Sequence, residues 1–396
     1  MPKHNRPPRG FDPQDVTPPP LPSGPWRVSA LALDVAGSCN LACRYCAEAA
    51  TQPRRDPMSA ETLKSAWAFL FPEGKPRGNT SLRLGSGEPL LALPLLSQVQ
   101  ELVAMGQERP AVFITTNGTL INRQVSDWLA ASGWHVKVSL DGPASIQDAW
   151  RVRPGGQGTF VKVAAAVADL AQRIPERLSV TAVLCRGADP VQVFEAIAQL
   201  GVRRIELVPV AHHQESVQPD ASDVERYEAF VRDYAHRYLE ASPGDNLPTL
   251  VRFESRVTRM MGYDNARIPC GAGRSFLGVG PDGDLYPCFR FIGIEPYRLG
   301  HLGSGLDKVA AADFCRGAGR TYQERAACRD CWASPLCGGP CFAVTEMFGP
   351  GDGQPLALHC AYVLADARAA VWLVSRLRQR DPERLLAFLP GKIEIE

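Results

Sequence analysis

Short apolar runs alternate with amphipathic stretches from about residue 27 to residue 240. The apolar runs are rich in Val, Ile and Leu and predict buried parallel strands; they lie near residues 29–35, 81–85, 111–115, 135–140, 178–184 and 203–209. The stretches between them predict helices; they lie near residues 59–71, 94–106, 121–132, 159–173 and 189–200. Ser59 and Asp189 are typical N-cap residues at two of these helix starts. The alternation predicts an α/β fold with a parallel barrel, because polar motifs follow the carboxyl ends of the strands.

The rest of the chain divides into segments of different character. Residues 1–26 hold nine prolines and predict an extended arm, because proline fixes φ and lacks an amide donor. Residues 220–239 carry aromatic side chains at helical spacing, which is typical of a core-facing helix. Residues 250–360 show little periodicity, so we expect metal–sulfur bonds to stabilise them in place of a large core. The predicted domains are an arm at 1–26, a barrel at 27–240, a Cys-rich domain at 241–360 and a helix with a tail at 361–396.

Composition narrows the class of protein. At 396 residues with 45% hydrophobic content, the chain can build more than one packed unit. The formal net charge is +1 and no dense Lys or Arg run is present, which argues against a nucleic-acid partner. No apolar run reaches the ~18–20 residues of a membrane span. No signal-peptide pattern opens the sequence, so the 12 cysteines predict metal ligands in a reducing cytoplasm rather than disulfides.

Cys39, Cys43 and Cys46 form a compact Cys-x3-Cys-x2-Cys motif directly after the first predicted strand. Three thiolates at this spacing can hold three irons of a 4Fe–4S cubane and leave the fourth iron open for chemistry. A structural zinc loop is the alternative interpretation. Zinc takes four ligands, and the neighbouring sequence offers no obvious fourth.

With the aromatic Tyr45 just before its last Cys, this motif resembles the signature of the radical S-adenosylmethionine (SAM) superfamily. The resemblance implies a partial (β/α)6 barrel of the TIM type. It also implies that SAM binds the open iron and that an electron cleaves it to a 5′-deoxyadenosyl radical.

Polar motifs after the next three strands extend the resemblance. The segment from Gly85 to Pro89 is similar to the family's Gly-Gly-Glu-Pro motif, in which small residues allow close backbone approach and Glu88 meets the SAM amine. Thr116 and Asn117 resemble the segment that lines the ribose, and Ser139 and Arg151 are implied donors to the SAM carboxylate. The full set of implied SAM contacts is Tyr45, Ser86, Gly87, Glu88, Thr116, Asn117, Ser139, Asp141 and Arg151.

The remaining cysteines resemble the SPASM extension of radical SAM enzymes, which carries two auxiliary iron–sulfur clusters. The implied ligands of one cluster are Cys328, Cys331, Cys337 and Cys360, and those of the other are Cys270, Cys288 and Cys341. The resemblance thus implies three 4Fe–4S clusters, of which the last has no fourth Cys ligand; Cys315 is an open candidate for that place. Cys185 and Cys315 are otherwise interpreted as small buried hydrophobes.

The resemblance implies a maturase that abstracts hydrogen from a ribosomally made peptide and installs a thioether, carbon–carbon or cyclophane crosslink. An anaerobic sulfatase-type formylglycine maturase is the first alternative, but that family typically has an acidic base where this chain has Phe289, directly after Cys288. A non-catalytic multi-cluster electron carrier is the alternative of another class, and it would have no use for the SAM motifs. The expected partners are a precursor peptide and an electron donor such as flavodoxin or ferredoxin; a separate leader-recognition protein is left open.

Overall fold

The computed structural model describes residues 27–46, 55–72, 79–106, 109–242, 245, 247–262 and 268–388. The arm predicted at residues 1–26 and the end of the predicted tail lie outside the described residues.

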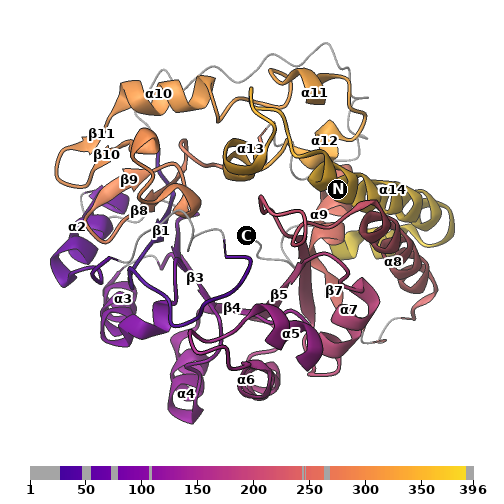
Figure 1. Cartoon of the computed structure of the whole chain (residues 1–396), viewed down its shortest axis with the longest axis horizontal. Helices are drawn as coiled ribbons and strands as arrows, with labels where there is room; N and C mark the ends of the chain where they lie inside the picture. The colour runs from indigo at the N-terminus through magenta and orange to yellow at the C-terminus, as the bar shows by residue number, and fades with distance from the viewer. Residues whose placement is uncertain are drawn as a thin grey trace, which may run out of the picture.

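One curved sheet organises the molecule (Figure 1). Its parallel strands are β1 (Ala30–Leu33), β2 (Ser81–Leu84), β3 (Ala111–Thr116), β4 (His135–Ser139), β5 (Leu178–Leu184), β6 (Arg204–Pro209) and the short β7 (Thr249–Leu250), in that spatial order. The six strands expected from the sequence are all present, and β7 is an addition at the edge. The partial parallel barrel is therefore confirmed.

Helices cover the outer face of this sheet, as Figure 1 shows. They are α2 (Ala60–Leu70), α3 (Leu93–Met105), α4 (Arg123–Ser132), α5 (Ala144–Trp150), α6 (Phe160–Arg173), α7 (Pro190–Ala198) and α8 (Ala221–Glu240). Both predicted N-caps are formed. The Ser59 side chain accepts from the Thr62 amide at 3.0 Å, and the Asp189 side chain accepts from the Val191 amide at 2.9 Å. Each satisfies a donor that the first helical turn leaves without a backbone partner.

The inner face of the sheet is more polar than the outer face. Along β5 buried and half-buried residues alternate, because successive strand side chains point to opposite faces. On the less buried face, Lys137 of β4 and Thr181 of β5 both bond to Oε2 of Glu206 on β6, each at 2.9 Å. The interior of the barrel therefore holds an ion pair across three neighbouring strands.

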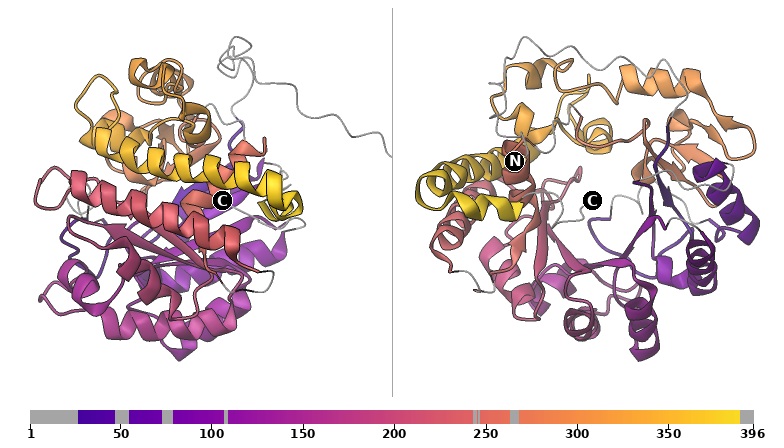
Figure 2. Two further views of the ribbon diagram at one scale, coloured as in Figure 1. Left: turned by 90° about the vertical axis from the view of Figure 1, so that its right-hand side faces the viewer. Right: turned by 180° about the vertical axis from the view of Figure 1, so that it is seen from behind.

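The Cys-rich region continues the same sheet. Strand β8 (Phe276–Val279) pairs with β1 in parallel, and the antiparallel strands β9 (Asp284–Tyr286), β10 (Gly300–His301) and β11 (Gly305–Leu306) follow it. Four helices complete the region: α10 (Lys308–Arg316), α11 (Ala326–Arg329), α12 (Ser334–Cys337) and α13 (Phe342–Phe348). Figures 1 and 2 show this region arching from the β1 edge to the side of α8 and α14, so that it spans the gap left by the partial barrel.

The expectation that residues 250–360 lack a large core is wrong. Leu277, Leu285, Phe291 and Phe342 are fully buried and belong to the same hydrophobic cluster as the barrel. Most elements of this region are only two to four residues long, apart from α9 (Val251–Met260), α10 and α13. Such short elements cannot produce a periodic pattern. The predicted domain boundary near residue 241 stays a prediction, since one sheet and one core cross it.

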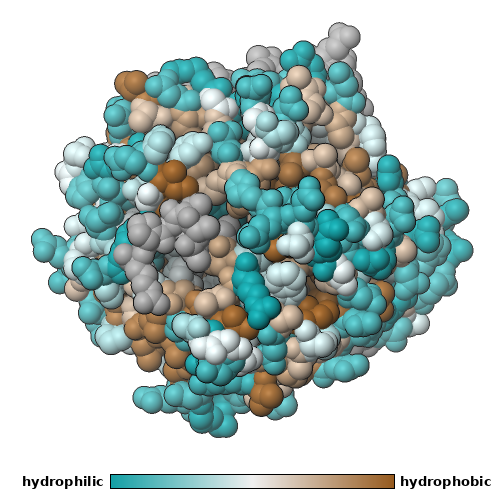
Figure 3. Space-filling view, in the orientation of Figure 1, coloured by the Kyte–Doolittle hydropathy of each residue, from teal (hydrophilic) through white to brown (hydrophobic). Residues whose placement is uncertain are grey.

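Helices α8 and α14 (Ala357–Arg380) lie side by side (Figure 2), and α9 (Val251–Met260) packs between α14 and strands β6 and β7. By length and composition α14 could span a membrane, but 44% of its most apolar window is buried inside the protein. It is a helix of the core. In Figure 3 hydrophilic side chains dominate the outer rim, as expected for helices that bury one face.

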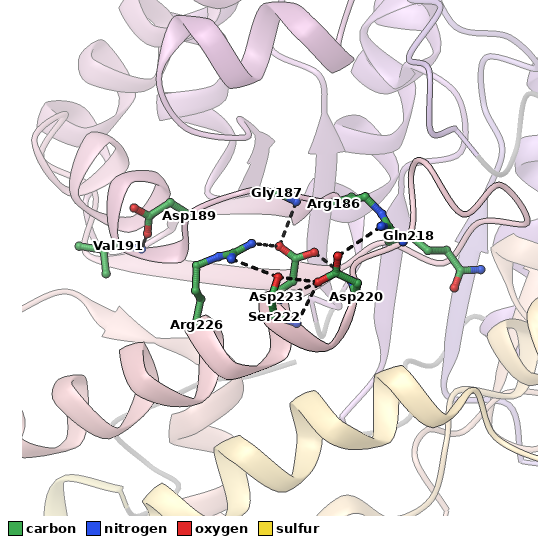
Figure 4. A network of polar contacts seen from close by, with 9 residues as sticks. All are labelled: Arg186, Gly187, Asp189, Val191, Gln218, Asp220, Ser222, Asp223 and Arg226. Carbon is green, nitrogen blue, oxygen red and sulfur yellow. Dashed lines mark hydrogen bonds and ion pairs between the residues drawn. The ribbon is translucent and has the colours of Figure 1, made fainter.

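A polar network fixes the loop after β5 to the start of α8 (Figure 4). The Arg186 guanidinium donates to Asp220 at 3.2 Å, and the Gly187 amide donates to Asp223 at 2.9 Å. Asp220 and Asp223 also form the capping box of α8. The loop that begins at Cys185 is thereby held against a rigid helix end.

Candidate active site

The loop that carries Cys39, Cys43 and Cys46 follows β1 at its carboxyl end. Two backbone hydrogen bonds attach it to the segment after α5, from Ala42 to Val152 at 2.8 Å and from Arg44 to Trp150 at 2.9 Å. The loop is therefore positioned by the far side of the barrel mouth as well as by its own strand.

The three thiols of this loop form one electrostatic group. Burial raises the pKa of Cys43 to about 12, and Arg151 partly opposes that shift while Cys46 and Cys39 add to it. Burial likewise raises the pKa of Cys39, with a contribution from Cys46. Thiols that oppose one another's ionisation need a bound cation to become thiolates, which is what iron supplies.

The described residues hold no group of three or more His, Cys, Asp or Glu side chains placed to bind a single metal ion. In a cubane each thiolate binds a different iron, so its ligands stay farther apart.

Glu88 is a fully buried carboxylate at the carboxyl end of β2. It accepts from the Thr116 hydroxyl at 2.7 Å, the Asn117 amide at 2.6 Å and the Leu90 amide at 3.1 Å. Burial still raises its pKa to about 7 against these neutral donors. A carboxylate held in this state suits a cationic ligand such as the ammonium group of SAM.

Gly87 has a φ of 63° and lies against the cluster loop. A Cβ at this position would stand 2.2 Å from the Ser38 carbonyl oxygen, and the Glu88 amide donates to that same oxygen at 2.9 Å. The need for a small residue therefore arises from contact with the loop that holds Cys39. Ser86 beside it is buried, so the hydroxymethyl group that replaces the family's first Gly fits inside the protein.

Asn117 links Glu88 to the cluster loop. Its side-chain amide donates to Asn40 at 2.8 Å and approaches the Cys39 sulfur at 3.7 Å, while its carbonyl oxygen accepts from Thr119. Asn40 in turn donates to the Thr119 hydroxyl at 3.0 Å. Sequence analysis missed Asn40 and Thr119; their only signal is that each lies within two residues of a predicted site residue.

Asp141 is the centre of a second buried network. Its carboxylate accepts from the Tyr45 hydroxyl at 2.5 Å, from Arg151 Nε at 3.0 Å and from the Val183 amide at 2.9 Å. The Arg151 guanidinium also lies 5.3 Å from the centre of the Tyr45 ring. The geometry gives Asp141 a positioning role and places the Arg151 charge near Cys43. Gln147, fully buried, orders this network by accepting from the Asp141 amide and was not anticipated.

Ser139 is the last residue of β4, on its less buried face, and it pairs in register with Thr181. It thus belongs to the same inner face as the Lys137 and Glu206 ion pair. Its contact with SAM stays a prediction.

Seven of the other nine cysteines fall into two further groups. Burial raises the pKa of Cys270 to about 11 and of Cys288 to about 12, and Cys341 contributes to both shifts. Burial raises the pKa of Cys360 to about 12, with contributions from Cys337, Cys328 and Cys331. These two groups match the two ligand sets implied by the sequence, and we retain the assignment as a prediction.

Cys185 and Cys315 are both buried and stand outside these groups. Cys315 points to the Gly273 carbonyl oxygen at 3.7 Å. Burial raises its pKa, and the side chains that oppose this shift are Arg274 and Arg316 rather than cluster cysteines. A role for Cys315 as the fourth ligand beside Cys270 stays a hypothesis.

Residues 34–200 match the family model described as the radical SAM superfamily. The chain is 25% identical over 334 residues to the serine-type anaerobic sulfatase-maturating enzyme of Klebsiella aerogenes, covering 81% of each protein. It is 26% identical over 359 residues to the serine-type enzyme of Bacteroides thetaiotaomicron, covering 81% of this chain and 84% of that one.

The fold is also similar to solved structures. A tagged form of anSMEcpe with bound AdoMet gives a TM-score of 0.75 at 20% identity, covering 91% of this chain and 97% of that one. Streptococcus suis SuiB bound to S-adenosylmethionine gives a TM-score of 0.56 at 19% identity, covering 81% and 74%.

The chain carries a radical SAM domain over residues 34–200, and the Cys-rich region that follows lies within the fold that the chain shares with anSMEcpe and SuiB. The chain is therefore an enzyme whose cofactors include SAM and a 4Fe–4S cluster. The site fits this pair, because three grouped thiols lie next to a buried carboxylate that is stabilised by neutral donors.

Proposed function

We propose that this enzyme is a maturase that installs an intramolecular crosslink between two residues of a ribosomally made peptide. The observation that carries the proposal lies in the group of Cys270, Cys288 and Cys341, where Phe289 and Arg290 directly follow Cys288 in place of an acidic base. The Arg290 guanidinium lies 5.4 Å from the centre of the Phe289 ring. A cation over an aromatic ring cannot accept the proton that formylglycine formation must remove.

SAM and its cluster would supply a 5′-deoxyadenosyl radical. Glu88 would bind the SAM ammonium, Asn117 would orient the cluster loop, and Arg151 and Ser139 would bind the carboxylate. The polar inner face of the sheet beyond them would line the substrate site. SuiB has been solved with its precursor peptide and anSMEcpe with a bound peptide, which supports a peptide substrate here.

The crosslink balances as a two-electron oxidation. One substrate hydrogen atom passes to the 5′-deoxyadenosyl radical, and the second leaves as a proton when the new bond forms. The remaining electron would pass to one of two auxiliary clusters, held by Cys328, Cys331, Cys337 and Cys360 or by Cys270, Cys288 and Cys341. We propose both clusters, with a cytoplasmic location and a flavodoxin or ferredoxin as the source of the initiating electron.

The test is co-expression with short reading frames next to this gene, followed by mass spectrometry of the peptide. The modified peptide should be ~2 Da lighter per crosslink, with one SAM consumed as the radical source. Fragmentation between the linked residues should be suppressed. An unmodified peptide in the presence of rapid SAM cleavage would contradict the proposal.

An anaerobic sulfatase-maturase activity is the second candidate, favoured by the two curated relatives of that description. Its product would be an aldehyde from Ser or Cys. The same mass spectrum distinguishes the two, because an aldehyde reacts with hydrazine probes and leaves fragmentation intact.

A further inference from the structure

Helix α9 carries three arginines on one face. Arg252, Arg256 and Arg259 are spaced by four and three residues, which aligns them along the helix. The helix packs against α12, which ends at Cys337, and against α14 (Figure 1). We call these three residues the arginine stripe.

The stripe is bonded to the backbone that presents Cys337. Arg256 Nη1 donates to the Leu336 carbonyl at 2.9 Å, and Arg259 Nη1 donates to the Cys337 carbonyl at 2.6 Å and to that of Leu336 at 3.1 Å. Arg252 lies further along and pairs with Asp366 at 3.3 Å. Asp366 is fully buried and also accepts from the Tyr227 hydroxyl at 2.7 Å.

Three half-buried cations so close together need nearby negative charge. Burial lowers the pKa of Arg256, and Cys337 and then Asp366 oppose that shift. Burial also acts against Arg252, but Asp366, Tyr227, Glu206 and Cys337 outweigh it and raise its pKa. Glu206 already pairs with Lys137, so Asp366 is the main carboxylate beside the stripe. Arg256 Nε is buried without a hydrogen-bond partner among the described residues.

A cubane held by four thiolates carries net negative charge, and one-electron reduction adds one more negative charge. Cations fixed nearby favour the reduced form, because the attraction grows with the charge of the cluster. The arginine stripe is therefore placed to stabilise an electron added to the cluster that Cys337 would bind.

We propose that Arg252, Arg256 and Arg259 raise the reduction potential of the cluster held by Cys328, Cys331, Cys337 and Cys360, and so make it the acceptor of the electron released by the product radical. The inference rests on the proposed function. The cluster takes up one electron, the substrate radical loses one, and the proton from the new bond goes to solvent.

The experiment is a potentiometric titration followed by electron paramagnetic resonance, on full-length protein reconstituted without oxygen. The protein used carries Ala in place of Cys39, Cys43 and Cys46, so that only auxiliary clusters contribute to the signal. Three single substitutions are then introduced into this triple-Ala protein, and the iron content of each variant is measured: Arg252→Gln, Arg256→Gln and Arg259→Gln. The control is Arg232→Gln on the exposed face of α8.

The expected result is a fall in the midpoint of one cluster that corresponds to at least a tenfold loss in the equilibrium for reduction, or about 59 mV for one electron. Arg256→Lys keeps the charge and should retain most of the potential, and Arg232→Gln should leave it unchanged. A structural role alone would move iron content or stability without this pattern.

An unchanged potential in all three Gln variants at full iron content would overturn the proposal. So would an equal fall in Arg256→Lys, because charge would then not be the cause. Loss of the cluster in all three Gln variants would overturn it as well, since the stripe would be structural. Absence of a crosslinked product from the enzyme that keeps Cys39, Cys43 and Cys46, with the potential shift present, would instead contradict the proposed function and leave the role of the stripe intact.

Discussion

At the scale of single residues, Glu88 has the most informative environment. Its folded-state pKa of about 7 lies above the ordinary value of 4.5 because burial disfavours the charge. Without SAM, its contribution to stability is fully present below about pH 4.5 and is lost as the pH rises through about 7. A bound ammonium group would reverse this preference by stabilising the ionised form.

We therefore predict that SAM binding releases a proton below about pH 7 and that the affinity rises from pH 6 to pH 8. Glu88→Gln should remove this slope and weaken binding at pH 8 by roughly 1.5–3 kcal/mol, as expected for a hydrogen bond to a charged group. Anaerobic calorimetry in buffers of different ionisation enthalpy measures both effects. The exposed Glu215→Gln is the control, and an equal slope in wild type and Glu88→Gln would refute the assignment.

Gly87 gives a second prediction, because its added Cβ would meet the Ser38 carbonyl at 2.2 Å. Gly87→Ala should displace the cluster loop, lowering SAM affinity and iron retention together. Gly156 has a comparable φ of 80° but open space around its Cβ position, so Gly156→Ala is the matched control. It should show only the left-handed strain of roughly 1–2 kcal/mol. Equal iron retention in the two variants would show that the contact with Ser38 does not matter.

The sequence singled out Cys39, Cys43, Cys46, Glu88 and Asn117, because each lies in a motif that follows the end of a strand. Their roles toward the cluster and SAM stay predictions. The sequence could not predict Asn40, Thr119 and Gln147, which touch other site residues rather than follow a pattern of their own. It also could not show that the Asp141 carboxylate accepts hydrogen bonds from Tyr45 and Arg151, because that depends on three segments meeting in the interior.

At the scale of elements, α14 illustrates how composition and packing differ. The helix is apolar enough to span a membrane, yet it packs along α8 and α9. We predict that Leu373→Ala, at 0% exposure, destabilises the protein by roughly 2–5 kcal/mol through a cavity. Val371→Ala, at 39% exposure on the same helix, should cost far less. Urea unfolding measures both, and similar midpoints would contradict the core assignment of α14.

The elements that sequence analysis located well are those long enough to show a period. Helix α6 and strand β5 were expected within a residue of their ends. Strands β7, β10 and β11 have two residues each and were not expected. Strand β8 was missed for another reason, because its pairing with β1 joins Ala30 to Phe276 and no local pattern records such a contact.

At the scale of the whole molecule, the three Cys groups make a prediction about metal content. Anaerobic reconstitution should give ~11–12 iron per chain, and replacing Cys39, Cys43 and Cys46 by Ala should remove ~4 of these and abolish SAM cleavage. Cys185→Ala is the matched control, since Cys185 is buried outside the groups and should leave the iron content unchanged. Stoichiometric zinc without charge-transfer absorbance would contradict the cluster assignment.

The parallel pairing of β1 with β8 determines what a shortened protein would do. A chain ending near residue 262 would keep every helix of the barrel and the pairing of β1 with β2, but the amide and carbonyl groups of β1 that face β8 would lose their partner strand. Such an open edge is a template for another copy, so we expect insoluble expression and intermolecular β-structure from the barrel made alone. By covering this edge of β1, the C-terminal segment should prevent self-association of the barrel. We therefore expect no soluble, active barrel from a gene that ends before β8.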